Sequence, residues 1–220
     1  MSQVVKIDEA EASRKDLQRA ISIIEEGGIV AFPTESFYGL GVDATNSSAI
    51  ERLFLVKKRD PGIPLLILIS SIHELSKYTA SIPIGALKLA RRFWPGGLTM
   101  ILQSSQALPS VLTAGTGKIG IRISSHPVAH ALTRALNHPV TGTSANISGR
   151  PPCIRADQVV ECLGEQVDLI LDGGITEGAR PSTLLDVTTN PPLLIREGII
   201  KAEEIIDSGI YREILVSTQN

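Results

Sequence analysis

Cysteine is scarce in this sequence, because Cys153 and Cys162 are the only two among 220 residues. Their spacing is neither that of a zinc site nor that of a redox motif, so we expect reduced thiols. His126 and His130 are four positions apart, but Pro127 lies between them and no third ligand is nearby. This pattern favours a histidine pair at a helix start over a metal site, and we identify no metal ligands in the protein.

Long apolar runs are also missing. The most apolar stretch, Ile63–Ile72, is about half the length that a membrane span needs, and it contains Pro64 and two serines. The first nine residues contain no apolar core of a signal peptide. We therefore expect a cytoplasmic protein with no membrane partner.

An excess of positive charge is absent as well. The formal net charge is −2 and aromatic residues make up only 4% of the chain. No global positive field draws such a protein onto nucleic acid, and few aromatic side chains are available for stacking on bases. Any binding of anions or RNA must come from a local patch.

Strand-like and helix-like segments alternate along the chain, which indicates an α/β fold with a twisted mixed β-sheet flanked by helices. We expect one domain over residues 1–220, with its core at about 12–200. The predicted strands are Val4–Ile7, Ile29–Phe32, Leu65–Ile69, Thr99–Leu102, Ile119–Ile123, Val140–Thr143, Leu169–Leu171, Leu184–Val187 and Leu193–Ile195. The predicted helices are Ala12–Glu26, Ser47–Val56, Pro83–Phe93, Val128–Leu136, Ala156–Leu163 and Ala202–Ile206.

A glycine pattern typical of dinucleotide sites occurs at residues 115–120. That pattern binds a pyrophosphate only where the glycines lead into a helix. Here Ile119–Ile123 reads as a strand, so we interpret the glycines as a plain turn.

A loop rich in hydroxyl groups follows the strand that ends at Phe32. We expect Thr34, Ser36, Tyr38 and the Glu35 carboxylate to face outward, where α/β sheets usually bind ligands. An ordinary turn capped by Thr34 is the alternative.

Cations occur at two informative places. Lys57 and Arg59 close a helix, where they either stabilise its dipole or bind phosphate. Arg122 lies in mid-strand on the face that it shares with Gly120, so it needs either solvent or an anionic partner. Small polar residues and arginines also gather after later strands, at 141–151, 181–184 and 194–198, and together they predict a polar, cation-lined cleft.

These residues resemble the YrdC/Sua5 family of threonylcarbamoyl-AMP synthases, in order, from about residue 12 to residue 200. The matching motifs are Pro33-Thr34-Glu35, Tyr38-Gly39-Leu40-Gly41, Lys57-x-Arg59, Phe93-Trp94-Pro95-Gly96, Ile121-Arg122, Ser144-Ala145-Asn146-x-Ser148-Gly149-Arg150-Pro151, Ser182-Thr183 and Arg196-x-Gly198. The sequence departs from the pattern at Asp60, Ile63, Leu68 and Gly97, and we expect the extra C-terminal domain of the longer Sua5 form to be absent. The resemblance implies a YrdC-like domain with a positively charged central cavity.

The implied reaction converts L-threonine, bicarbonate and ATP, with Mg²⁺, to threonylcarbamoyl-AMP and pyrophosphate for tRNA modification. Downstream threonylcarbamoyl-transferase proteins would use the product. The resemblance assigns catalysis to Lys57 and Arg59. It also assigns residues to the binding of ATP and of threonine. ATP binding falls to Lys57, Arg59, Ser144, Asn146 and Arg196, and threonine binding to Thr34, Arg122 and Ser182.

Two alternatives stay open. A double-stranded RNA-binding protein could use the same cationic cleft for RNA phosphates, and direct binding of tRNA would fit it too. A YrdC paralogue with other carbamoyl-adenylate chemistry would also fit the motifs.

Overall fold

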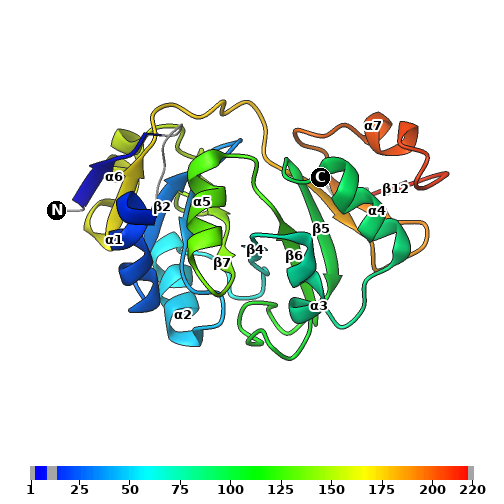
Figure 1. The fold of residues 1–220 in the computed structure, drawn as a ribbon, viewed down its shortest axis with the longest axis horizontal. Coiled ribbons are helices and arrows are strands. Elements are labelled where there is room, and N and C mark those ends of the chain that lie inside the picture. The colour runs from blue at the N-terminus through cyan, green and yellow to red at the C-terminus, as the bar shows by residue number, and fades with distance from the viewer. Residues whose placement is uncertain (1–2, 9–13, 218–220) are drawn as a thin grey trace.

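The computed structural model describes residues 3–8 and 14–217, in which helices and strands alternate as expected for an α/β protein. The predicted start of the first helix, at Ala12, lies outside these residues. Two mixed sheets are present where we predicted one. In Figure 1 the strand β2 lies to the left and β5 and β6 to the right, with β4 between them.

The first sheet has the order β1-β9-β2-β3-β8. Its strands are β1 (Gln3–Lys6), β9 (Leu169–Asp172), β2 (Val30–Pro33), β3 (Tyr38–Gly41) and β8 (Thr143–Ser144). The second sheet has the order β12-β11-β10-β5-β6-β4-β7. Its strands are β12 (Leu215–Val216), β11 (Leu193–Arg196), β10 (Thr183–Asp186), β5 (Leu98–Gln103), β6 (Lys118–Arg122), β4 (Leu66–Leu68) and β7 (Val140–Thr141).

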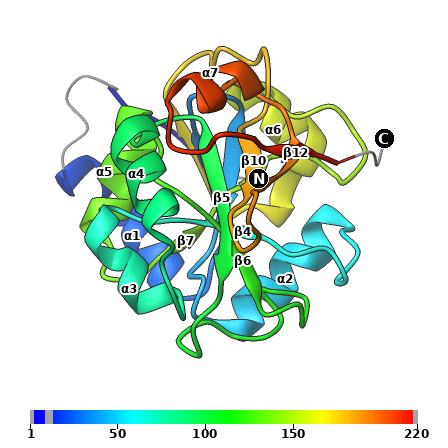
Figure 2. The ribbon, with the colours of Figure 1, turned by 90° about the vertical axis from the view of Figure 1, so that its right-hand side faces the viewer.

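Helices cover both sheets. They are α1 (Arg14–Glu25), α2 (Ser47–Lys57), α3 (Leu75–Tyr78), α4 (Ile84–Phe93), α5 (Pro127–Ala135), α6 (Ala156–Leu163) and α7 (Ala202–Asp207). In Figure 2, α3 and α4 lie to the left of β5 and β6. The sequence patterns missed α3 and β12, because a segment of one helical turn and a segment of two residues are too short to show a period.

The predicted strand over residues 140–143 is present but divided, since the chain leaves the second sheet at Thr141 and enters the first at Thr143. Gly142 makes the change of sheet possible. Its N–H donates to the carbonyl oxygen of Leu66 at 3.0 Å, and a Cβ atom here would lie 2.6 Å from Cδ1 of Leu66. A side chain at position 142 would therefore have to displace the side chains of Leu66 and Leu68 where the two sheets join.

The predicted loop from Pro33 to Thr45 is wrong, because β3 occupies Tyr38–Gly41 within it. Its two glycines read as a loop, but a Cβ atom on Gly41 would lie 2.5 Å from Cγ1 of Val140. The strand needs glycine for close packing rather than for a turn.

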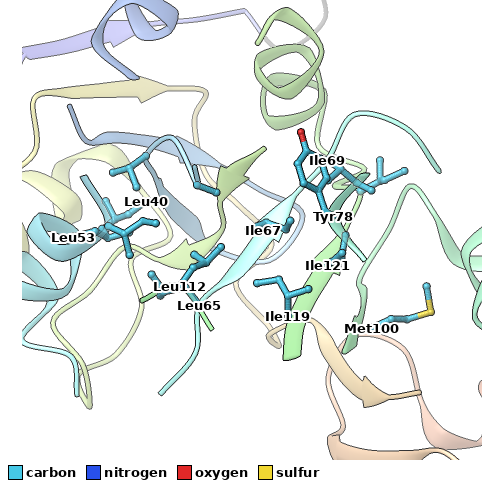
Figure 3. Packing of buried hydrophobic residues seen from close by; sticks show 14 of the residues in the cluster. Leu40, Leu53, Leu65, Ile67, Ile69, Tyr78, Met100, Leu112, Ile119 and Ile121 are labelled. Carbon is cyan, nitrogen blue, oxygen red and sulfur yellow. The ribbon is translucent and has the colours of Figure 1, made fainter. Parts of the chain in front are cut away.

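One large apolar cluster joins elements of both sheets. It runs from Leu40 and Leu53, on β3 and α2, to Ile121 and Met100, on β6 and β5 (Figure 3). The two sheets therefore share a core, which fixes the position of the edge where they meet.

Candidate active site

A cavity of about 710 Å³ lies where the two sheets meet. Six of the eight residues predicted to bind substrates contribute to its wall, and they come from widely separated parts of the chain. They are Thr34, Arg59, Arg122, Ser144, Ser182 and Arg196. The convergence of these residues, which the sequence could only suggest, is therefore present in the fold.

One face of the second sheet forms the floor of this cavity. On it, Leu184 pairs with both Arg196 and Thr99, and Ile101 pairs with both Asp186 and Gly120. Side chains alternate between faces along a strand, so Gly120 and Arg122 share this face as predicted. The floor is cationic where Arg122 and Arg196 lie and apolar around Ile101.

Arg122 is buried, with 3% of its side chain exposed, and its partner is Glu35. Nη1 donates to Oε1 of Glu35, whose other oxygen accepts from the Ser124 hydroxyl. Nε has no hydrogen-bond partner among the described residues. Burial first, and then the nearby Arg196, lowers the pKa of Arg122 to about 10. The guanidinium thus stays charged at neutral pH and forms an ion pair with the Glu35 carboxylate.

The side chain of Glu35 was expected to face outward, and that expectation is wrong. Thr34 and Ser36 are buried in the cavity wall, where Oγ1 of Thr34 donates to the carbonyl oxygen of Phe37 at 2.7 Å. Tyr38 is also buried, contributes to the cavity wall and donates its hydroxyl proton to the carbonyl oxygen of Gly174 at 2.7 Å. Residues 34–37 form the bend between β2 and β3, and this bend turns the Glu35 carboxylate toward Arg122 and Ser124.

Lys57 lies behind the cavity rather than in its wall, with only 1% of the residue exposed. Its Nζ donates to the carbonyl oxygen of Asn146 at 2.8 Å, to Oδ1 of Asn146 at 3.2 Å and to the carbonyl oxygen of Ser144. Asn146 is held further by its Nδ2, which donates to the carbonyl oxygen of Arg150 at 2.5 Å. Lys57 and Asn146 thus fix the loop that presents Ser144.

The buried position of Lys57 predicts a pH dependence of stability. Burial, and then the charge of Arg59, lowers the pKa of Lys57 to about 7 from the model-peptide value of 10.5. Between these values the unfolded chain binds more protons than the folded one, so stability rises with pH. From pH 7 to pH 9 we expect the wild type to gain roughly 2 kcal/mol more than Lys57→Met, measured by urea unfolding. An identical pH profile for both proteins would contradict this expectation.

Arg59 and Arg196 approach the cavity from opposite parts of the chain. Nη2 of Arg59 donates to the carbonyl oxygen of Pro64 at 2.9 Å, and Nη2 of Arg196 donates to the carbonyl oxygen of Ser182 at 2.9 Å. These bonds fix each guanidinium while other N–H groups stay available for an anion. The backbone beside Arg196 is tight, since a Cβ atom on Gly198 would lie 2.1 Å from the carbonyl oxygen of Pro181.

Two charged wall residues were missed from the sequence. Nζ of Lys118 donates to Oδ2 of Asp186 at 2.8 Å, and both residues line the cavity. The glycines at 115 and 117 form the turn that we predicted, and β6 rather than a helix follows them. The alternation along β6 could have placed Lys118 on the face of Gly120 and Arg122.

Three of the four departures from the family pattern lie in or near the segment that follows α2. The Asp60 carboxylate accepts from the N–H of Gly62 at 2.8 Å, within the turn after α2. Ile63 lines the cavity, whereas Leu68 is fully buried in the core. Only Ile63 therefore changes the cavity wall directly.

Metal ligands are not grouped in the described part of the chain, where no cluster of three or more His, Cys, Asp or Glu side chains could hold an ion. His126 instead caps α5, because its Nδ1 accepts from the N–H of Val128 at 3.3 Å. Within residues 3–8 and 14–217, no helix is both long and apolar enough to span a bilayer.

Comparisons with known proteins point to one family. A family model for Sua5, YciO and YrdC proteins, described as "Telomere recombination", matches residues 22–198. The chain is 41% identical to the threonylcarbamoyl-AMP synthase of Pyrococcus abyssi over 84% of its own length and 55% of that protein. It is 35% identical to the synthase of Vibrio vulnificus, over 83% of this chain and 98% of the relative.

The fold agrees with these matches. The crystal structure of P. abyssi Sua5 complexed with L-threonine superposes with a TM-score of 0.92 at 36% identity, covering 99% of this chain and 62% of that one. The chain spans little more than half the length of the P. abyssi and Bacillus subtilis relatives, 55% and 58%. In the V. vulnificus relative the match covers nearly the whole protein.

Proposed function

We propose a function for this chain from its family, because the chain belongs to the Sua5/YciO/YrdC proteins. We infer that it is a threonylcarbamoyl-AMP synthase, which converts L-threonine, bicarbonate and ATP to threonylcarbamoyl-AMP and pyrophosphate. Use of the product by threonylcarbamoyl-transferase proteins in tRNA modification, and a cytoplasmic location, stay predictions. The relatives named as synthases support this function over the RNA-binding alternative.

The observation that carries the proposal is the meeting of three arginines and three hydroxyl residues in one cavity. The reaction gathers negative charge on the triphosphate, so fixed cations must already be in place. Arg59 and Arg196 supply them, and Ser144 presents polar groups to the nucleotide. Lys57 and Asn146 act through the loop that they hold.

The amino acid binds deeper in the cavity than the nucleotide, against the face of the second sheet that forms the cavity floor. The buried Arg122 binds its carboxylate, and Thr34 and Ser182 bound the same region. This placement brings the amine next to bicarbonate or CO₂, and the resulting carbamate oxygen attacks the α-phosphate. Because carbamates decompose in water, enclosure of the reactants contributes to the rate.

Magnesium enters as part of the ATP substrate. Among the residues that the structure describes, Asp186 is the one carboxylate in the cavity wall, and it already pairs with Lys118. Such a wall fits an ion carried on phosphate oxygens better than an ion held by a set of protein ligands.

Release of pyrophosphate, assayed with ATP, bicarbonate and either threonine, serine or no amino acid, tests the function. We expect release that depends on threonine, together with the mass of threonylcarbamoyl-AMP in the product. Release without any amino acid, or no release at all, would contradict the proposal. Release with another carbamoyl donor alone would favour the paralogue.

A further inference from the structure

Arg196 faces the cavity because β11 contains a bulge. Leu185 of β10 pairs with Leu194 of β11. The residue before it, Leu184, pairs with Arg196 rather than with Ile195, so Ile195 is an extra residue in β11. Such a bulge re-aims the side chains beside it. In the regular register Ile195 would lie opposite Leu184 on the cavity face, and Arg196 would point to the other face of the sheet.

Strand pairing fixes this bulge from one end only. The outer neighbour of β11 is β12, which in the described part of the chain pairs with Leu193 and Leu194 but not with Arg196. A slip of one residue would remove the bulge and turn the Arg196 guanidinium away from the cavity. The chain that follows Arg196 therefore needs an anchor of its own.

Thr183 supplies this anchor. Its side chain is buried, and its hydroxyl makes three hydrogen bonds to the segment that follows Arg196. Oγ1 donates to the carbonyl oxygen of Ile200 at 2.5 Å, and it accepts from the N–H groups of Gly198 at 2.9 Å and of Ile200 at 3.0 Å. The single proton and both lone pairs of the hydroxyl are thus in use.

The backbone contacts nearby show what depends on this hydroxyl. The N–H of Ile199 donates to the carbonyl oxygen of Pro181 at 2.9 Å, so one backbone bond supports the same arrangement. The strand β10 is held from its other side by β5, and the N–H of Thr183 donates to the carbonyl oxygen of Gly97 at 2.8 Å. Loss of the Thr183 hydroxyl would therefore loosen the segment after Arg196 while β10 stays in place.

We propose that Thr183 is a positioning residue for ATP binding, because its hydroxyl locks the bulge of β11 and so keeps Arg196 in the cavity. Its neighbours Ser182 and Leu184 line the cavity, and Thr183 between them points to the opposite face. Thr183 thus acts through Arg196 rather than on a substrate. The assignment rests on the proposed function, in which Arg196 binds the triphosphate.

The test compares Thr183→Val, which removes the hydroxyl at nearly constant shape, with Thr183→Ser, which keeps it. Titration calorimetry gives the Kd for ATP with Mg²⁺ in the absence of an amino acid, and pyrophosphate release gives the KM for threonine. In Thr183→Val we expect the Kd for ATP to rise about tenfold, as loss of one hydrogen bond to a charged group implies. The KM for threonine should change much less, and Thr183→Ser should behave like the wild type.

A double-mutant cycle with Arg196→Gln separates positioning from general destabilisation. If Thr183 acts through Arg196, Thr183→Val should not weaken ATP binding further in a protein that already carries Arg196→Gln. The buried Thr79 supplies a matched control, because its hydroxyl also donates to a backbone carbonyl oxygen, that of Leu75 at 2.7 Å. Thr79→Val should leave the Kd for ATP unchanged.

Two results would overturn the assignment of Thr183 alone. One is an unchanged Kd for ATP in Thr183→Val, and the other is a cycle in which the effects of the two substitutions add. A wild-type protein that binds ATP but releases no pyrophosphate with threonine would reject the proposed function, while the Kd values for ATP would still test Thr183. A wild-type protein that does not bind ATP would reject both.

Discussion

Lys57→Met is expected to lower threonine-dependent pyrophosphate release at least about 100-fold and to reduce the free energy of unfolding by about 2 kcal/mol. Methionine keeps an unbranched side chain, one atom shorter than that of lysine, but donates no hydrogen bond. The carbonyl oxygen of Asn146, which accepts from Nζ at 2.8 Å, would lose its partner. The loop carrying Ser144 would then lose its fixed position at the cavity wall.

Activity and stability must be measured separately for this variant. Circular dichroism establishes the temperature range in which it stays folded, and pyrophosphate release is assayed within that range. Lys58→Met is the matched control, because Lys58 is the next residue and its side chain is exposed. A folded Lys57→Met protein with full activity would show that the three hydrogen bonds of Nζ have no part in catalysis.

The role of Lys57 illustrates how far the sequence could go. A lysine and an arginine at a helix end predicted either a solvated terminus or a phosphate clamp, and the helix does end at Lys57 as predicted to within a residue. Burial of the ammonium group depends on a loop 87 residues further along the chain. No local pattern encodes such a contact, so the sequence identified the residue but not its surroundings.

The sheets were predictable to a similar degree. Fully apolar segments such as Leu66–Leu68 were confirmed as strands, because a buried strand is apolar on both faces. Gly142, however, divides one apparent strand between two sheets, and β3 was hidden by its glycines. In both places the glycine allows close packing. In a sequence such a glycine cannot be told from a glycine in a turn.

Arg122→Gln is expected to raise the KM for threonine about 100-fold while changing the KM for ATP much less. Truncating one member of a buried, hydrogen-bonded charge pair costs on the order of 2–5 kcal/mol of binding where the charge meets a ligand. The same change should lower the free energy of unfolding by about 3 kcal/mol, because the Glu35 carboxylate would remain buried without its counter-charge. Steady-state kinetics and urea unfolding measure the two effects.

The double variant Glu35→Gln/Arg122→Gln separates binding from folding. It removes both charges, so most of the lost stability should return, since two neutral amides can pair where the ions did. The KM for threonine should nevertheless stay high, because no cation remains to meet the carboxylate. If the double variant recovered its affinity for threonine, Arg122 would act only by balancing Glu35. Equal increases in both KM values would instead place the Arg122 guanidinium between the two substrates.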